Sequence, residues 1–236
     1  MTETEAHRFT QSEVFGARSA HAQIYANAGN RMAAQLMPPS AITILDVGCG
    51  AGDNARLLRT QNTARQITGI TLNRAEAELA AADCAAVHVA DATSVNLDSL
   101  GGPFDAILFS HVLEHVSEPT AVLERFLGCL NPKGSVIIIV PNVLQWRIRL
   151  QLMLGHFDCP DHGVLDRTHL RFFTPRTVVR ELISPVHQLR LDQIVLNGSV
   201  PLAFLRRSLL SNEVRSHLDR FGARMAPANR YVASDG

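Results

Sequence analysis

The chain has 236 residues, 46% of them hydrophobic, and its 22 Lys and Arg balance 22 Asp and Glu. This length and the even spread of apolar residues predict one α/β domain with enough core to fold alone. The first 140 residues hold 9 basic and 14 acidic side chains, the remainder 13 and 8. Because no dense basic run occurs, this imbalance indicates solvated helix faces or an anionic substrate rather than nucleic acid.

Neither a leader nor a membrane span is predicted. The first five residues are acidic and lack an apolar region, and the longest strongly apolar run, residues 136–140, is too short to cross a bilayer. We therefore expect a soluble, cytoplasmic protein without stable membrane insertion. The four cysteines, Cys49, Cys84, Cys129 and Cys159, form no Cys-x-x-Cys pair, which favours free thiols.

Residues 1–40 are expected to form an N-terminal helical arm, with helices between residues 15 and 37. A strand then ends in the sequence ILDVGCGAG, in which Asp46 precedes glycines at positions 48, 50 and 52. Glycines let the backbone approach a ligand, and the next helix offers unpaired N–H groups at its start. The dinucleotide fingerprint spaces its third glycine differently, and an acid beside a pyrophosphate would be costly.

With Asp46, this loop resembles motif I of the class I S-adenosylmethionine (SAM) methyltransferases, whose ligand carries an ammonium and a sulfonium group. The resemblance covers residues 42–141 by motif. It implies that Gly48 and Gly50 line the methionine part of SAM and that Asp46 helps to hold its amino end.

Residues 66–71 are predicted to form the second strand, and a helix follows from about residue 73 to 82. At the end of this strand the family usually has an acid that binds both ribose hydroxyls, but this chain has Thr71, followed by Leu72 and Asn73. A neutral side chain still bonds hydroxyls, with roughly half the strength of a charged one. A similar Gly-x-Thr-Leu-Ser occurs in cyclopropane fatty-acid synthases, so Thr71 and Leu72 are assigned to the cofactor.

The third strand, residues 86–90, closes on Asp91 and Ala92. By the same resemblance these residues receive the adenine, with the Asp91 carboxylate at its amino group. The alternative is that Asp91 is an ordinary cap at the end of a strand.

The fourth strand, residues 104–110, runs into the loop that in this family lies beside the reactive methyl group. Ser110 is therefore assigned to the cofactor, and His111 is the leading candidate for a base that removes a hydroxyl proton. The alternative is a histidine that only packs or bonds to the cofactor, because methyl transfer mainly requires alignment and a dry pocket.

Residues 111–115 also match His-x-x-Glu-His, a zinc-peptidase motif that requires a long helix. The ubiquinone-type O-methyltransferases carry Glu-x-x-Glu-His here, which can hold a divalent ion, and this chain resembles them except for His111 in place of the first acid. We expect no metal, and keep a site formed by His111, Glu114 and His115 as the alternative.

A helix at 118–130, a turn at 131–134 and a fifth strand at 135–140 precede a long polar insertion, residues 142–174, called here the lid. Its end, residues 165–174, resembles methyltransferases encoded with surface-polysaccharide glycosyltransferases. Long insertions of this kind often bind ligands. We expect His169 and Arg171 to position a hydroxyl-rich or anionic acceptor, and Phe172 and Phe173 to anchor the lid in the core. A buried ion-pair network is the alternative.

Residues 175–236 should complete the sheet, with a helix at 175–183, a strand near 189–196, a further helical part and a last strand at 230–234. The whole predicts a doubly wound, Rossmann-like α/β fold with seven strands, in which residues 41–141 bind the cofactor. The predicted function is methyl transfer from SAM to a small-molecule or glycan-linked acceptor, at oxygen. The alternatives are a metal-assisted O-methyltransferase of a quinone-like or phenolic acceptor, and a non-catalytic SAM-fold protein that binds a partner through its basic C-terminal part.

Overall fold

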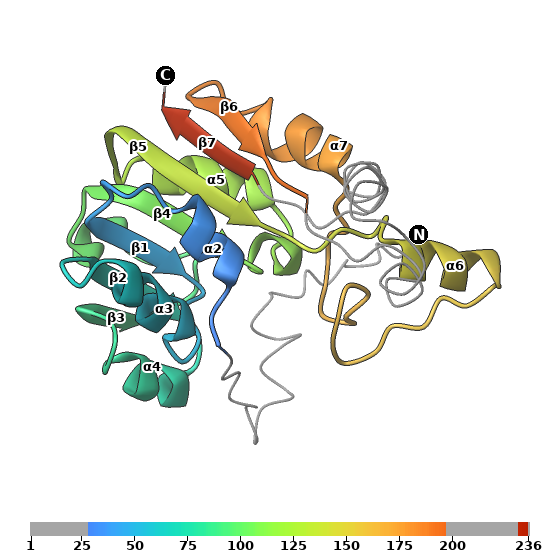
Figure 1. The fold of residues 1–236 in the computed structure, drawn as a ribbon, viewed down its shortest axis with the longest axis horizontal. Coiled ribbons are helices and arrows are strands. Elements are labelled where there is room, and N and C mark those ends of the chain that lie inside the picture. The colour runs from blue at the N-terminus through green and yellow to red at the C-terminus, as the bar shows by residue number, and fades with distance from the viewer. Residues whose placement is uncertain (1–27, 197–230, 236) are drawn as a thin grey trace, which may run out of the picture.

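The computed structural model describes residues 28–196 and 231–235, which form one α/β sheet with helices on both faces (Figure 1). The seven strands lie in the order β3-β2-β1-β4-β5-β7-β6. The first five strands of this order, β3, β2, β1, β4 and β5, pair in parallel. Strand β7 pairs antiparallel with both β5 and β6. The strands are β1 (Thr43–Val47), β2 (Gln66–Thr71), β3 (Ala86–Val89), β4 (Phe104–Ser110), β5 (Leu130–Ile139), β6 (Leu189–Ile194) and β7 (Tyr231–Asp235).

The helices of the described residues are short, and several begin at a polar residue that caps them. Asn73 accepts a hydrogen bond from Ala75 N at 2.9 Å at the start of α4, and Thr174 forms a capping box with Thr177 at the start of α7. The helices are α2 (Arg31–Leu36), α3 (Asp53–Gln61), α4 (Arg74–Ala80), α5 (Pro119–Leu127), α6 (Trp146–Met153) and α7 (Pro175–Val178), with short helical turns η1 (Leu97–Leu100), η2 (Leu113–His115) and η3 (Val179–Ile183). Because η3 continues α7, the helix predicted at 175–183 is confirmed.

The core consists of two apolar layers, one on each face of the sheet. Ile107 and Phe109 of β4 pack in the layer covered by α5, α7 and η3, whereas Ala106 and Leu108 pack in the layer covered by α2 and α3. This alternation is the two-residue period of a strand, and it explains why β4 is apolar at nearly every position. Burying a side chain such as Phe109 completely stabilises the fold by about 1.5–3 kcal/mol, and its edge contact with Phe126 fixes α5 on the sheet.

The turn η1 joins β3 to β4. The connection from α5 to β5 differs from the sequence prediction. The predicted helix at 118–130 ends at Leu127, and the predicted turn at 131–134 lies inside β5, because Leu130 already pairs with Phe104 before the register shifts. Asn131 Nδ2 donates to Asp105 Oδ1 at 2.9 Å, and Lys133 takes a left-handed φ of 65°, so this part of β5 is an irregular extended segment.

The carboxyl ends of β1, β4 and β5 point toward α6 and the rest of the lid (Figure 1). Ligands of doubly wound folds bind at this edge of the sheet. Of the N-terminal arm, residues 28–40 are described, including α2. The expected helices at 15–27 and the helical part expected between 197 and 229 lie outside the described residues.

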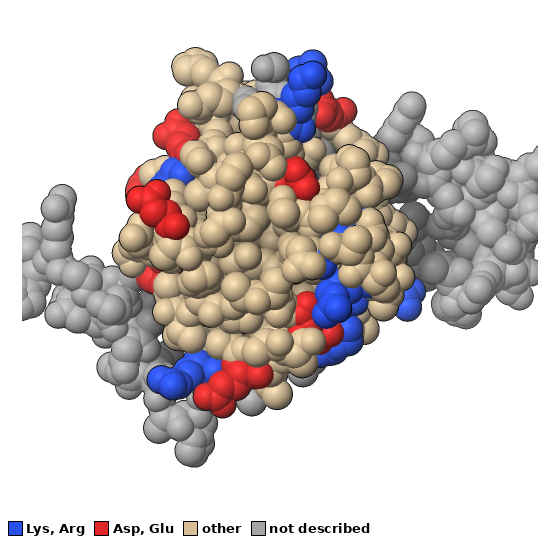
Figure 2. All heavy atoms as spheres, turned by 90° about the vertical axis from the view of Figure 1, so that its left-hand side faces the viewer, with Lys and Arg blue, Asp and Glu red and all other residues tan. Residues whose placement is uncertain are grey.

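Figure 2 shows the opposite face, where the parallel strands begin. Among the described residues visible there, basic and acidic side chains are interspersed, mostly near the rim, so this face carries no continuous basic surface. In the described ranges, no helix combines the length and the apolar character needed to cross a membrane.

Candidate active site

The glycine loop after β1 adopts left-handed backbone angles that favour glycine: φ is +77° at Gly48, +52° at Gly50 and +84° at Gly52. Gly48 N and Cys49 N both donate to Ile70 O, at 2.9 and 2.8 Å, which ties the loop to the end of β2. A Cβ on Gly48 would lie 2.4 Å from Val112 Cγ2, in the loop after β4. Close packing between the two loops therefore requires glycine at this position, in addition to any requirement of the ligand.

Asp46 is buried completely at the end of β1. Neither of its carboxylate oxygens has a hydrogen-bond partner within the described part of the chain. Burial raises its pKa to about 7, and the nearby Asn54 side chain opposes this rise only in part. A buried carboxylate without a partner is costly, and a cationic group would compensate it. An ammonium group such as the amino end of SAM would provide this charge, and the assignment of Asp46 to it stays a prediction.

Asn30 connects the N-terminal arm to this site, a contact that sequence reasoning missed. Its backbone N–H donates to Asn54 Oδ1 at 2.9 Å, and its Nδ2 donates to Ser110 Oγ at 3.2 Å. Asn30 also caps α2 by accepting from Met32 N at 3.0 Å. The capping pattern was the only available sequence signal, and it does not reveal the contact with Ser110.

At the end of β2, Thr71 meets a carboxylate that sequence reasoning also missed. Thr71 Oγ1 donates to Glu76 Oε2 at 2.8 Å, and both side chains are buried. Asn73 N donates to Thr71 Oγ1 at 3.2 Å, so the hydroxyl is held from two sides. The next side chain, Leu72, is 74% exposed and leaves an apolar surface beside this polar pair.

Asp91 has one oxygen engaged and one open. Its Oδ1 accepts from Thr93 N and Thr93 Oγ1, both at 2.7 Å, which is the arrangement of a strand-end cap. No hydrogen bond reaches Oδ2 from the described residues. Ala92 packs against the core layer of α5. The capping alternative therefore holds for one oxygen, and the adenine assignment stays a prediction for the other.

His111 is paired with a buried acid. Its Nδ1 lies 3.2 Å from Glu114 Oε1, and its ring is about half exposed while the Glu114 side chain is fully buried. The backbone of His111 has a φ of 58°, and its N–H donates to Ile139 O at 2.9 Å. This left-handed turn and the three-residue η2 replace the long helix of the zinc peptidases, so that alternative is excluded.

The end of the lid lies against η2. Leu170 N and Arg171 N donate to Glu114 O at 2.8 and 3.0 Å. The rings of His115 and His169 stand edge to face, with centroids 4.7 Å apart. Burial lowers the pKa of His115, and the charge of Glu114 opposes this. The structure thus brings His169 to the loop after β4, beside the pair formed by His111 and Glu114.

Arg171 contacts the segment after η2, and its predicted role at the acceptor stays a prediction, whereas Phe172 lies differently from the sequence prediction. Arg171 Nε donates to Ser117 O at 3.1 Å, and its guanidinium lies 3.7 Å from Glu118, so it holds the lid to the segment after η2. Phe173 is buried as expected, but Phe172 is 40% exposed, and the prediction that it anchors the lid in the core is wrong. Consecutive residues of an extended segment point to opposite sides, so only one of them can reach the core.

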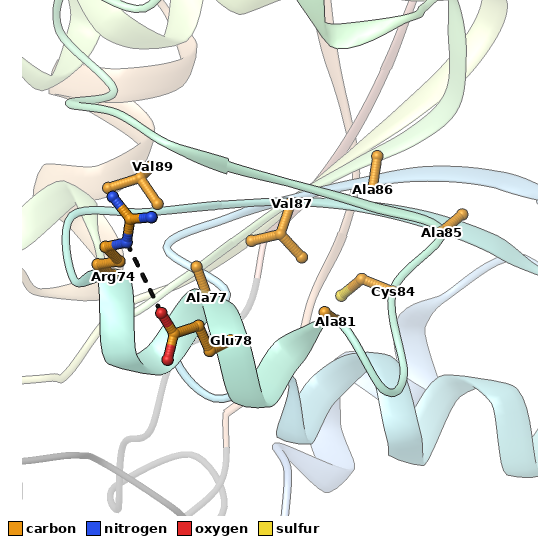
Figure 3. Close-up of a pocket in the computed structure, with 9 residues that line it drawn as sticks. All are labelled: Arg74, Ala77, Glu78, Ala81, Cys84, Ala85, Ala86, Val87 and Val89. Carbon is orange, nitrogen blue, oxygen red and sulfur yellow. Dashed lines mark ion pairs between the residues drawn. The ribbon is translucent and has the colours of Figure 1, made fainter.

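A surface hollow lies between α4 and the edge strand β3 (Figure 3). Alanines and valines form most of its wall, Cys84 lies at one end, and Arg74 pairs with Glu78 at 3.6 Å at the other. Its lining includes neither the glycine loop nor the loop after β4. We therefore assign it no part in the chemistry.

Comparison with known proteins connects this geometry to a family. A family model described as a methyltransferase domain matches residues 18–182. The chain belongs to this methyltransferase family. The match includes the glycine loop, the loop after β4 and the lid, and it confirms the class of enzyme that the sequence predicted.

The curated relatives include O-methyltransferases. The ubiquinone biosynthesis O-methyltransferase of Idiomarina loihiensis is 27% identical over 169 residues, which are 66% of this chain and 64% of that protein. That of Caulobacter sp. strain K31 is 32% identical over 115 residues, 44% of this chain and 43% of that protein. The methyltransferase chain thus spans less than two thirds of these relatives' own length.

Solved structures share the fold. A SAM-dependent methyltransferase from Archaeoglobus fulgidus superposes with a TM-score of 0.57 at 18% identity, covering 84% of this chain and 87% of that one. The plantazolicin methyltransferase BpumL, solved with S-adenosylhomocysteine (SAH), gives a TM-score of 0.54 at 18% identity, covering 83% and 76%. Together with the family match and the geometry at Asp46, these findings support SAM as the cofactor.

Proposed function

We propose that this methyltransferase transfers the methyl group of SAM to an oxygen atom of a small-molecule or glycan-linked acceptor. The acceptor site lies between the loop after β4 and the lid. The observation that carries this proposal is the pair formed by His111 and Glu114, 3.2 Å apart at the carboxyl end of β4. A hydroxyl must lose its proton when it is methylated, and this pair is built to accept one.

The atoms of the pair have distinct roles. A carboxylate only accepts hydrogen bonds, so Nδ1 of His111 carries the hydrogen that points to Glu114, and Nε2 is left with a lone pair. Glu114 fixes the tautomer and orientation of the ring and stabilises its protonated form, as an acid does for histidine in a catalytic triad. The His111 side chain is about half exposed, and Nε2 would be the atom that takes the acceptor proton.

We assign the binding of SAM to residues at this same edge of the sheet. Bound SAM would supply an electrophilic methyl group on its sulfonium. Asp46 would hold its ammonium, while Gly48 and Gly50 would let the backbone approach its methionine part. Thr71 would bind the ribose together with Glu76, Leu72 and Ala92 would pack against the adenine, and Asp91 would bind its amino group through Oδ2. Ser110, whose hydroxyl accepts a hydrogen bond from Asn30, directly precedes His111 and would also contact the cofactor.

The chemistry of the acceptor separates two versions of the proposal. A glycan-linked acceptor is supported by the polar lid and its likeness to methyltransferases of polysaccharide clusters. A phenolic or quinone-like acceptor is supported by the O-methyltransferases among the relatives. A phenol is more acidic than a sugar hydroxyl, so it should depend less on a base.

The test is SAH release by the purified full chain, with nucleotide sugars and with simple catechols as acceptors. His111→Ala and His111→Gln should reduce turnover of a sugar hydroxyl at least 100-fold while SAH affinity stays unchanged. His156→Ala, which changes an exposed histidine of the lid, is the matched control. Full turnover by both His111 variants would refute His111 as the base, and SAH binding without turnover of any acceptor would favour the non-catalytic alternative.

A further inference from the structure

The two oxygens of Glu114 have different environments. Oε1 lies 3.2 Å from His111 Nδ1. Oε2 is buried and has no hydrogen-bond partner within residues 28–196. An unpaired buried carboxylate oxygen costs about 1–3 kcal/mol or more. A cationic partner at this oxygen would compensate its burial, and His111 does not provide one.

Two imidazoles lie close to Glu114, one from η2 and one from the lid. His115 Nδ1 lies 3.3 Å from Thr168 O and 3.2 Å from Thr168 Oγ1, and His169 Nδ1 lies 3.0 Å from Val164 O. Since a carbonyl only accepts and the Thr168 hydroxyl donates to Asp166 Oδ1, both Nδ1 atoms carry hydrogen, and both Nε2 atoms are left with lone pairs. A histidine that binds a metal commonly donates its other N–H to a carbonyl in this way.

The three side chains are close enough to share one ion. One ligand atom from each of Glu114, His115 and His169 lies within 4.8 Å of the other two. Two ligands at about 2.1 Å from a tetrahedral ion are roughly 3.4 Å apart, so small side-chain adjustments would suffice. The backbone bonds from Leu170 and Arg171 to Glu114 O already hold the lid in place. Little ordering is then required when an ion binds.

We propose that Glu114, His115 and His169 bind a first-row divalent transition metal, with Zn²⁺ as the best match. Two imidazoles and one carboxylate suit Zn²⁺, whereas Mg²⁺ prefers oxygen ligands and retains its water. This set differs from the alternative derived from the sequence, because the lid supplies the third ligand and His111 is not one. Three protein ligands leave one position of a tetrahedral ion for water or an acceptor oxygen.

The test measures binding of the metal itself and needs no acceptor, so its failure would leave the proposed function standing. The full chain is treated with EDTA, desalted and titrated with ZnCl₂ and, separately, with MgCl₂ in a calorimeter. We expect about one Zn²⁺ per chain and no measurable Mg²⁺ binding. His169→Ala and Glu114→Gln should each weaken Zn²⁺ binding at least tenfold, about 1.4 kcal/mol, whereas His156→Ala should not.

A Co²⁺ titration followed by visible absorption gives a second measurement, because the spectrum reports ligands and geometry. His115→Ala should change that spectrum, and His156→Ala should leave it unchanged. Retained SAH affinity in each variant shows that the protein is folded. Failure of the wild-type chain to bind Zn²⁺, or equal Zn²⁺ affinity in wild type and His169→Ala, would overturn the proposal.

Discussion

Thr71 donates a hydrogen bond to Glu76 at 2.8 Å, and both side chains are buried where β2 ends. The resemblance to SAM methyltransferases places an acid at position 71, where this chain has a neutral residue. In the structure a carboxylate comes instead from the first turn of α4 and lies next to the threonine hydroxyl. The chain therefore has an acid in this region, supplied by a different element.

This contact reverses the effect that the family pattern would suggest for Thr71→Asp. From the pattern alone, an acid at position 71 should preserve or tighten cofactor binding. In the structure the new carboxylate would lie beside Glu76, and two buried carboxylates at this distance cannot both stay ionised. We expect weaker SAH binding and a lower midpoint of thermal unfolding, whereas Thr71→Ser, which keeps the donor, should resemble wild type. Tighter SAH binding by Thr71→Asp would show that Glu76 does not serve the ribose.

Asp46 should make cofactor binding depend on pH. Its pKa in the free protein is raised to about 7 by burial, and a bound ammonium group would favour the ionised form. Binding must then release a proton at pH values below about 7, so SAH affinity should fall as pH falls, by up to tenfold per pH unit. Calorimetry in two buffers with different ionisation enthalpies measures both the affinity and the number of protons released.

The contribution of Asp46 to the stability of the free protein should change with pH in the opposite direction from SAH affinity. Because the folded-state pKa lies above the unfolded one, the native state binds more protons, and the contribution of Asp46 to folding is lost as pH rises toward 7. Asp46→Asn should bind SAH more weakly and with little dependence on pH. A wild-type affinity that is constant from pH 6 to pH 8 would place the amino end of the cofactor away from Asp46.

Gly48→Ala should lower both stability and SAH affinity, because a Cβ would lie 2.4 Å from Val112 Cγ2 in a residue whose φ is +77°. Gly101→Ala is a matched control: its φ is +79°, but nothing lies within 4 Å of the added Cβ. The control should cost about 1–2 kcal/mol for the backbone alone, and Gly48→Ala should cost more. Adding Val112→Ala should recover the difference. Equal unfolding free energies for the two glycine variants would show that the loop moves away from the added Cβ without a loss of stability.

The sequence predicted β2 and β4 over the same residues that the structure shows. β4 is a mainly apolar run that ends at polar residues and is buried on two faces, so its local signal is strong. β2 has only Ile67 and Ile70 as large apolar residues, so its signal is weaker. The glycine loop was also readable, because left-handed turns leave glycines at fixed spacing.

The contacts of Glu76 and Glu114 could not be predicted from the sequence in this way. Glu76 looks like an ordinary helical acid in the sequence, whereas Glu114 was noted there as part of the His-x-x-Glu-His stretch. Only the packing of α4 and η2 shows that both acids are buried. The meeting of Glu114 with His169 joins residues 55 positions apart, and it depends on how the lid folds back over β4. Phe172 and Phe173 show a missed local signal, since strand alternation would have assigned only one of them to the core.

Arg171 should act on the acceptor through the lid and leave the cofactor unaffected. Its guanidinium joins the lid to Ser117 O and Glu118, beyond η2, and not to the glycine loop. Arg171→Ala should leave SAH affinity unchanged, reduce acceptor turnover about tenfold, or 1.4 kcal/mol in the barrier, and speed proteolytic cleavage between residues 154 and 170. Arg167→Ala, which breaks a pair with the exposed Asp161, is the control and should change little.

Because lysine cannot form the two-pronged contact with Ser117 O, Arg171→Lys should restore only part of the activity. Loss of SAH affinity in Arg171→Ala would instead connect this side chain to the cofactor, and unchanged turnover and cleavage would show that the backbone bonds to Glu114 hold the lid without it.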